Sequence, residues 1–417
     1  MSKTLFTSLS PNTEKDDILL AVSLIFRPWL WERGGAIAEV EKYFQTELDT
    51  PYCFGFESGR TALTVALRAL GIGEGDEVLI QAYTCVAVVN SVLWAGAKPV
   101  FVDIDSTLNM DMDLAEQKVS EKTKAVIIQN TFGNPADMGK VMELASKHKI
   151  KIIEDCAHAL GSQFDGKKIG TFGDAVIFSF GRDKVVSSVF GGMLVCKNSQ
   201  TAGRIKEIRT VYKYPSKIWI LRQLLHPIIL WKAKIFYNWF GLGKVILEIA
   251  KRLGLITKAV YPEERIGGKP DFIGKIMPNA MAMMTLKQLK KLDRYIDHRK
   301  KIAKIYDEEL IGCSGLQKQE QIKTGEHTFL RYTVFTNESG KLLAAAKREK
   351  IFLGDWYRQV IAPAGVDYTR IGYIPGSCPR AERFAEQSVN LPTSIQIAEG
   401  DAKRVAQIVI NLLCPSK

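Results

Sequence analysis

The chain has 417 residues, 46% of them hydrophobic, so it is long enough for two domains of ordinary size with a large apolar core. Its formal net charge is +12, but eight of these charges fall between residues 213 and 269, where eleven Lys and Arg stand against three Glu. Apolar residues separate the charges of this segment, and the rest of the chain is close to balanced. We therefore expect no nucleic-acid partner.

The cysteines and the N-terminus indicate the compartment. Residues 1–17 lack the positive segment and apolar run of a signal peptide, so we expect a cytoplasmic protein. The cysteines form no CxxC pair and no metal-ligand spacing, and most lie among apolar residues: 53, 85, 156, 196, 313, 378 and 414. This pattern favours reduced thiols over a disulfide framework, and we expect no metal.

Short apolar runs alternate with helical stretches from about Ser58 to Cys196. The runs predict strands within residues 77–83, 99–105, 124–133, 150–157, 174–180 and 191–196. Strands of this length, separated by helices, indicate a mostly parallel, doubly wound α/β sheet. "GIGEGDEV" precedes a strand instead of linking a strand to a helix, so we interpret it as a turn and not as a nucleotide-binding loop.

A second unit follows the sheet. Residues 279–310 show helical spacing with no breaker for about thirty residues, which predicts a helix that joins two domains. The runs at 327–336, 341–352 and 400–413 alternate strand and helix, as in an α+β unit. We place the large domain at residues 12–290, with a basic insert at 213–270, and the small C-terminal domain at 291–417.

Three polar residues follow or end predicted strands. Asp155 comes directly after an apolar run, Ser179 ends "VIFS", and Lys184 stands five residues further on. The carboxyl ends of parallel strands gather ligand groups, so the three could share one crevice. These three groups suit pyridoxal phosphate. The amine would bond to its aldehyde, the carboxylate would keep its pyridine nitrogen protonated, and the hydroxyl would donate a hydrogen bond to its phosphate. Taken alone, Asp155 favours a helix cap over a site residue, and Lys184 has the alternative of a surface lysine in a loop.

Upstream, "FESGRTALTVALRAL" opens a helix at Arg60 or Thr61. Free backbone N–H groups at a helix start form an anion site, to which Arg60 would add a charge. Ser58 as a simple N-cap explains the same residues.

Together these motifs closely resemble the DegT-like (DegT/StrS) sugar aminotransferases, pyridoxal phosphate enzymes of fold type I. The matching pieces are SG(x)TAL, GDEV, GAKPVFVDID, IIEDCAHALGS, FSF, Lys184, GGM and a late NLPT, and they span about residues 17–413. The resemblance implies a seven-stranded, mostly parallel large domain with a smaller α+β domain. It also implies a homodimer with the active site at the subunit interface.

The same resemblance implies site roles. Lys184 is the Schiff-base lysine, and Asp155 pairs with the pyridine nitrogen. His158 takes the place of the family's glutamine near the ring hydroxyl. Ser179 and the amides of Gly59 and Arg60 fall where the family binds phosphate. The keto-sugar acceptor would be nucleotide- or lipid-linked, in polysaccharide or glycoconjugate synthesis, and glutamate is the family's usual donor.

Several residues depart from the family. Arg60 replaces a threonine, and Cys85 replaces an aromatic ring that stacks on the cofactor, a role that neighbouring Tyr83 takes over if the strand register allows. The family's phosphate-binding asparagine from the partner subunit should fall near Gly274, so it is absent unless Asn279 substitutes.

Beside Lys184, Val189 and Phe190 make one wall apolar. The departures leave two alternatives open. One is a sugar dehydratase, disfavoured because that branch has histidine in place of the lysine. The other is a non-catalytic scaffold that binds a membrane-linked partner.

Residues 216–260 are longer and more hydrophobic than the corresponding segment of typical members. No uncharged run reaches the ~20 residues that span a bilayer. In residues 244–253 the charged positions 244, 248, 251 and 252 share one helical face, opposite Ile246, Ile249, Ala250 and Leu253. Tryptophans 219, 231 and 239 and flanking lysines are typical of interfacial helices, so contact with an anionic membrane, at its inner face, is one interpretation. Packing against the protein body or a dimer partner is the other.

Overall fold

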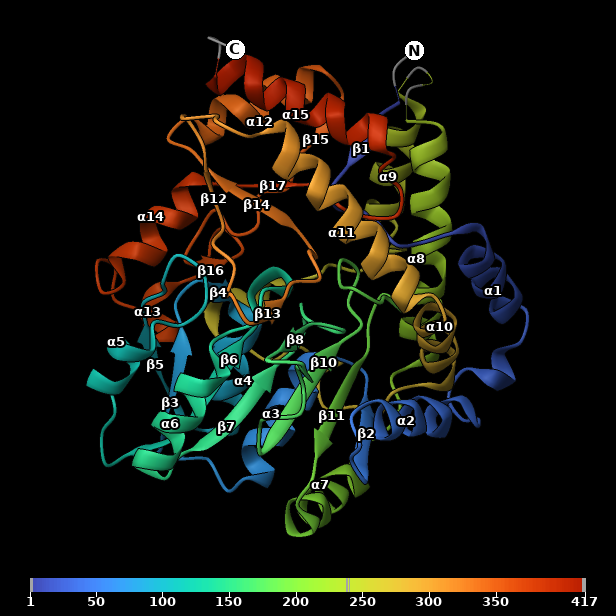
Figure 1. Cartoon of the computed structure of the whole chain (residues 1–417). Helices are drawn as coiled ribbons and strands as arrows, with labels where there is room; N and C mark the ends of the chain where they lie inside the picture. Colours follow the sequence, from blue (N-terminus) through green and yellow to red (C-terminus); the bar gives the residue numbers. More distant parts are fainter. Residues whose placement is uncertain (1–2, 238, 240, 415–417) are drawn as a thin grey trace.

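The computed structural model describes residues 3–237, 239 and 241–414. Its main feature is a seven-stranded sheet with helices on both faces (Figure 1). The strands follow one another in space as β2 (Tyr52–Phe56), β11 (Gly192–Cys196), β10 (Ala175–Ser179), β7 (Lys151–Asp155), β6 (Thr123–Gln129), β3 (Glu77–Gln81) and β5 (Lys98–Val102). All run in one direction except β11, which is antiparallel to both neighbours. The predicted mostly parallel α/β sheet is confirmed.

Side chains alternate between the two faces of this sheet, as the two-residue period of a strand requires. In β10, Val176 and Phe178 join one buried apolar cluster, whereas Ala175 and Ile177 join the other. The first cluster lies under α2 (Ala36–Glu47), α5 (Met112–Gln117), α6 (Met138–His148) and α10 (Asn279–Leu289). The second lies under α3 (Gly59–Ala69), α4 (Val86–Ala95) and α7 (Ser199–Thr210). Burial on both faces explains why the strands read as continuous apolar runs.

A smaller α+β unit follows. Its antiparallel sheet of β12 (Gln317–Lys318), β14 (Tyr332–Phe335) and β17 (Ser388–Leu391) packs with helices α11 (Leu292–Glu309), α12 (Ser339–Arg348) and α15 (Glu399–Leu413) in a third core. The N-terminal β1 (Leu5–Phe6) pairs in parallel with β15 (Ile351–Phe352) of this unit. The remaining short elements are β4 (Thr84–Cys85), β8 (Gln163–Phe164), β9 (Lys167–Lys168), β13 (Gly325–Glu326), β16 (Ile361–Ala362), η1 (Pro28–Leu30), η2 (Thr131–Gly133), α13 (Tyr368–Ile371) and α14 (Pro379–Gln387).

The prediction of a single helix over residues 279–310 is wrong. The chain leaves helical geometry at Lys291, so that α10 and α11 are separate helices. The Lys291 ammonium lies 2.9 Å from carboxylate oxygens of both Asp16 and Asp17. Since the residues at the break are ordinary helix formers, the break reflects this tertiary contact and not local propensity.

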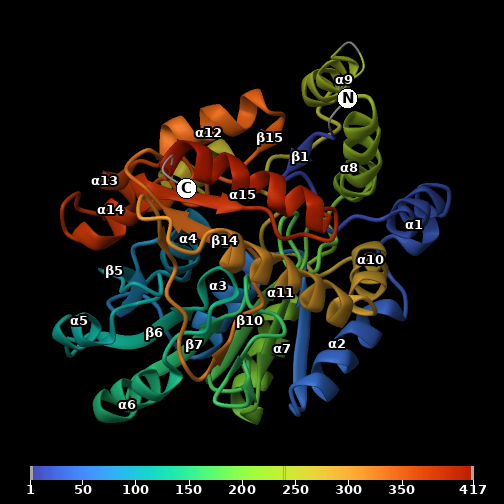
Figure 2. The ribbon, with the colours of Figure 1, turned by 45° about the horizontal axis from the view of Figure 1, so that its top comes forward.

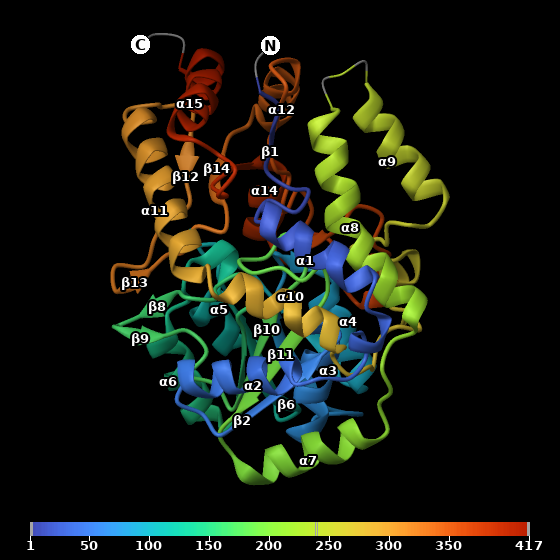
Figure 3. The same cartoon turned by 90° about the vertical axis from the view of Figure 1, so that its right-hand side faces the viewer.

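The basic insert forms a helical hairpin of α8 (Lys217–Ile235) and α9 (Leu242–Arg252), followed by η3 (Pro262–Ile266). Figure 3 shows the two helices side by side, standing out from the sheet, and Figure 2 gives a second view. Helix α8 packs against α1 (Lys15–Ile25) on one side and α9 on the other. Among the described residues, none of the helices combines the length and apolar content that crossing a bilayer requires.

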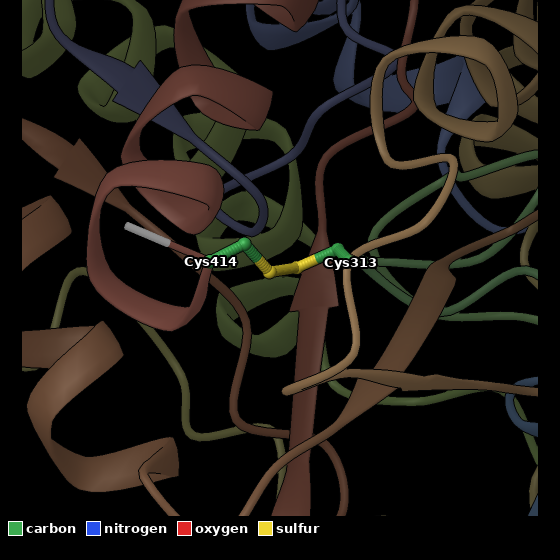
Figure 4. Close-up of a disulfide and its surroundings, with 2 residues drawn as sticks. All are labelled: Cys313 and Cys414. Carbon is green, nitrogen blue, oxygen red and sulfur yellow. A yellow bond between two sulfur atoms is a disulfide. The ribbon is translucent and has the colours of Figure 1, made fainter. Parts of the chain in front are cut away.

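One disulfide contradicts the expectation of reduced cysteines. Cys313 and Cys414 are bonded, with Cα atoms 5.5 Å apart, whereas the other five cysteines are free (Figure 4). Each of the two follows the C-terminal end of a helix, α11 or α15, and these helices pack together. A sequence separation of 101 residues hides this proximity from any local spacing rule.

Candidate active site

A cavity of about 170 Å³ lies at the carboxyl ends of β7 and β10. Lys184, Asp155 and Ser179 all line it, as the strand-end argument predicts. Gly59, Arg60, Cys85 and His158 line it too, so the structure brings every residue of the predicted site into one cavity. Further walls come from Ala259 and Val260 of the insert and from Trp356 and Tyr357 of the small C-terminal unit.

Lys184 lies in the loop between β10 and β11, and the fold fixes its backbone. The Asn12 side-chain amide donates to the carbonyl oxygen of Lys184 at 2.7 Å. The amine Nζ lies 5.5 Å from the centre of the Trp356 ring. Burial lowers the pKa of this amine, Arg331 lowers it further, and the Asp155 carboxylate opposes the shift. A lowered pKa increases the share of neutral, nucleophilic amine, and Lys184 lines the cavity instead of standing on the open surface.

Asp155 is the last residue of β7 and is 5% exposed. Its Oδ1 accepts a hydrogen bond from the Ala157 N–H at 3.0 Å, and no helix begins there, so the helix-cap interpretation fails. Burial raises the pKa of Asp155, while that hydrogen bond and the charge of Lys184 act in the opposite direction. Such a buried carboxylate gains from a cation placed beside it.

The start of α3 meets the end of β10 closely. A side-chain carbon added at Gly59 would lie 3.0 Å from Ser179 Cβ, so this close contact leaves little room for a larger residue. Ser58 caps the helix, accepting from the Thr61 N–H at 3.2 Å. The cap and the anion site coexist, because the first N–H groups of a helix have no intrahelical acceptor.

A buried carboxylate that the sequence reading missed lies under this helix start. Glu57 accepts hydrogen bonds from Ser58 Oγ at 2.9 Å and from the Lys275 N–H at 3.0 Å, and also from Thr61 Oγ1. Burial raises the pKa of Glu57 to about 7. The hydroxyls of Ser58 and Thr61 therefore face this carboxylate. The groups left at the helix start to donate hydrogen bonds to an anion are the backbone amides.

Two residues do not take the roles predicted for them. Tyr83 does not face the cavity. It is buried, and its hydroxyl lies 3.0 Å from both Ser388 Oγ and the Tyr357 nitrogen. Asn279 does not replace the missing asparagine. Its side-chain oxygen accepts a hydrogen bond from the Ala36 N–H, and its side-chain nitrogen donates one to the Leu30 carbonyl of the same chain. The aromatic ring beside Lys184 is Trp356, some 170 residues distant in sequence, and no local motif indicated it.

His158 is neutral in this environment. Its Nδ1 accepts from the Phe132 N–H at 3.3 Å, and its Nε2 lies 3.4 Å from the Tyr357 hydroxyl. Burial lowers the pKa of His158 well below its ordinary value, and the charges of Lys184 and Arg331 act in the same direction. Because Nδ1 accepts, the ring proton sits on Nε2, and the imidazole is a fixed donor at the cavity wall.

The donor set fits pyridoxal phosphate. The cavity holds an amine of lowered pKa, a buried carboxylate and a helix start, which match an aldehyde, a pyridine nitrogen and a phosphate. The buried Gln129 Oε1 also lines the cavity and has no hydrogen-bond partner among the described residues.

Comparison with known proteins points to aminotransferases. The model of the DegT/DnrJ/EryC1/StrS aminotransferase family matches residues 12–215 and 272–410, so the gap coincides with the insert. GDP-perosamine synthase of Escherichia coli O157:H7 is 32% identical over 74% of this chain and 71% of its own length. UDP-N-acetyl-3-dehydro-alpha-D-glucosamine 3-aminotransferase of Acidithiobacillus ferrooxidans is 30% identical over 86% of this chain and 84% of its own.

Solved structures share the fold. The aminotransferase from Psychrobacter cryohalolentis superimposes with a TM-score of 0.76, at 21% identity, over 97% of this chain and 98% of its own. A Streptococcus pneumoniae protein, solved in a PLP form and a PMP form, gives a TM-score of 0.75 at 22% identity over 97% of both chains. At these identities the likeness concerns the fold.

Proposed function

Because the chain belongs to the DegT/DnrJ/EryC1/StrS aminotransferase family and is thus a pyridoxal phosphate enzyme, we propose that it transfers an amino group to the keto group of a nucleotide- or lipid-linked sugar. The observation that carries the proposal is the convergence of Lys184 and Asp155 in one cavity. Relatives named for a GDP-linked and a UDP-linked amino sugar support the substrate class.

Pyridoxal phosphate, when bound, supplies the electron sink that makes the donor's α-proton removable. Lys184 would hold the cofactor through its aldehyde carbon, and its amine would take up and return a proton beside that carbon. The Asp155 carboxylate holds the proton on the pyridine nitrogen. The backbone amides of Gly59 and Arg60 and the Ser179 hydroxyl hold the phosphate, and His158 donates toward the ring hydroxyl. Cys85 contributes only a wall.

The donor half-reaction tests this proposal. We expect the cofactor-loaded protein to lose its visible absorbance when glutamate is added without an acceptor, and to regain it when a keto-sugar follows. Glutamate's failure to change the absorbance, with other amino acids failing too, would favour the non-catalytic scaffold. An acceptor that loses water without gaining nitrogen would instead indicate a dehydratase.

A homodimer is part of the proposal. Apolar side chains from α1 to η1 are strongly exposed, with Phe26, which follows α1, at 75%, Trp29 at 70% and Leu19 at 68%. A contiguous exposed apolar patch commonly marks a subunit interface. The family's use of a partner residue at the phosphate also favours two chains per functional unit.

The α8–α9 hairpin supports a further proposal, contact with an anionic bilayer. The side chains of Leu242, Val245, Ile249 and Leu253 form an exposed apolar stripe on α9. Only Ala250 of the predicted apolar face is buried, so that face is not simply packed against the body. Arg252 lies beside the stripe, and residues 213–269 as a whole carry a net charge of +8, which favours an anionic lipid surface over a neutral protein partner.

Liposome flotation tests the membrane contact. We expect the protein to float with vesicles containing anionic lipid at low salt and less at high salt, since each basic residue near the surface contributes about 1 kcal/mol. Changing Lys244, Lys251 and Arg252 together to Glu should weaken flotation, because it lowers the net charge of the insert by six. The same charge reversal at Lys301, Lys304 and Lys403, exposed on α11 and α15, is the matched control and should retain most of it. A wild-type protein that stays at the bottom of the gradient at low salt contradicts the proposal.

A further inference from the structure

The insert does more than present the α8–α9 hairpin, because the segment after it reaches the cavity. Ala259 and Val260 line the wall, as noted above. Thr257 Oγ1 accepts a hydrogen bond from the Arg182 guanidinium and donates to Gln223 Oε1 of α8 at 3.0 Å. The insert is thus hydrogen-bonded to Arg182, which stands only two positions before Lys184.

The same segment also holds Arg60. The Arg60 Nε lies 3.0 Å from Oε1 of Glu264, a fully buried carboxylate, and the guanidinium also donates to the Ala259 carbonyl. The side chain of Arg60 is only 12% exposed. Arg60 was expected to add a charge at the helix start, but its side chain is held by the insert.

The two arginines are neighbours. Their guanidinium carbons lie 5.9 Å (Arg60) and 5.5 Å (Arg182) from the centre of one ring, that of Phe190, and both residues line the cavity. Burial lowers the pKa of Arg182 to about 10, with Arg60 acting in the same direction and Asp183 against it. Two guanidinium groups beside one apolar ring repel each other unless an anion lies between or before them.

Their hydrogen-bonding capacity is not used up. Within the described part of the chain, Arg60 Nη1 and Arg182 Nε are buried and have no hydrogen-bond partner. Glu264 forms an ion pair with Arg60, but no carboxylate of the described residues lies within ion-pair distance of Arg182. Buried N–H groups of a charged side chain are costly to leave unpaired, so a ligand that accepts from them is favoured.

We propose that Arg60 and Arg182 form a phosphoryl-binding subsite whose shape is set by the insert through Thr257, Ala259 and Glu264. The forked guanidinium donors match the oxygens of a phosphate or diphosphate, which is also the group that links a sugar to a nucleotide or lipid carrier. The subsite rests on the proposed function for its biological ligand. Its phosphoryl group comes either from the substrate's carrier or from the cofactor, because Arg60 is the second residue of α3, the helix whose first amides we assign to the cofactor phosphate.

Two binding measurements separate these sources. Pyrophosphate is titrated calorimetrically into the cofactor-loaded protein, and pyridoxal phosphate is titrated spectroscopically into the apoprotein. We expect Arg182→Gln and Arg60→Gln to weaken pyrophosphate binding by roughly tenfold or more, and to change cofactor affinity less than about twofold. The reverse pattern would assign the subsite to the cofactor phosphate. If both variants bind both probes within about twofold of the wild-type affinity, the proposed subsite is overturned.

Control variants keep the outcome interpretable. Arg222→Gln removes the same charge from an exposed position on α8 and should leave both affinities unchanged. If Arg182→Gln does not fold, Thr257→Val removes the hydroxyl that accepts from Arg182 and donates to Gln223, keeps the arginine, and should weaken pyrophosphate binding in the same direction. A Thr257→Val protein that binds pyrophosphate like wild type would then overturn the insert's role.

The donor half-reaction with glutamate, measured on the same proteins, separates failure of the subsite from failure of the aminotransferase proposal. That half-reaction requires no phosphorylated acceptor. A protein that reacts with glutamate but binds pyrophosphate independently of both arginines loses only the subsite. A protein that binds pyrophosphate through them but never reacts with any amino donor loses the proposed function.

Discussion

Replacing Lys184 by alanine is expected to lower the rate of amino transfer by several orders of magnitude, because one amine both bonds to the cofactor and carries the proton. The rate of the glutamate half-reaction, followed by visible absorbance, measures this directly. Borohydride should fix the cofactor on the Lys184 peptide of the wild-type protein and leave the Lys184→Ala protein unlabelled.

The fold should tolerate this change. Asn12 holds the backbone carbonyl of Lys184, and removing a buried amine relieves a desolvation cost. Lys167→Ala, an exposed lysine of the same domain, serves as the control and should keep full activity. Undiminished transamination by Lys184→Ala, or borohydride labelling at another lysine, would show that Lys184 is not the reactive amine.

The central residues of the site could be predicted because they follow from local rules. Asp155 and Ser179 end buried parallel strands, and Lys184 lies in the next loop, so the sheet alone brings them to one edge. Gly59 opens a helix directly after β2, so the strand-to-helix pattern located it as well. In each case a strand and the few residues after it contained the whole signal.

Other features depend on contacts between distant segments and could not be predicted in this way. Trp356 comes to Lys184 from the C-terminal unit, and Glu264 comes to Arg60 from the insert. The break before α11 depends on how Lys291 meets α1. The Cys313–Cys414 bond depends on α11 and α15 ending side by side.

The register of short elements was a separate difficulty. Tyr83 stands only two residues before Cys85, and alternation along a strand would place both on one face. The chain turns between β3 and β4, so Cys85 lines the cavity while Tyr83 packs behind it against Ser388. Short strands with irregular connections do not obey the alternation on which the expectation depended.

Asp155→Asn is expected to raise the barrier of the half-reaction by about 3 kcal/mol, a loss of more than about 100-fold in rate, because a neutral amide cannot hold the pyridine nitrogen protonated. The oxygen that accepts from the Ala157 N–H is retained in asparagine, so the turn after β7 should survive. Asp113→Asn, in which the removed carboxylate is 82% exposed, is the control and should be as active as wild type.

Stability and activity should change in opposite directions in this variant. Burial raises the pKa of Asp155 in the folded protein, so the folded apoprotein binds a proton that the unfolded chain has lost. Its free energy of unfolding therefore falls as the pH rises from about 4, the ordinary aspartate pKa, through the raised value. The Asn variant does not lose stability in this way as the pH rises. At neutral pH its apoprotein should therefore have a melting temperature equal to or higher than that of the wild-type apoprotein. An Asp155→Asn protein that melts higher yet transaminates at the wild-type rate would show that Asp155 has no role at the pyridine nitrogen.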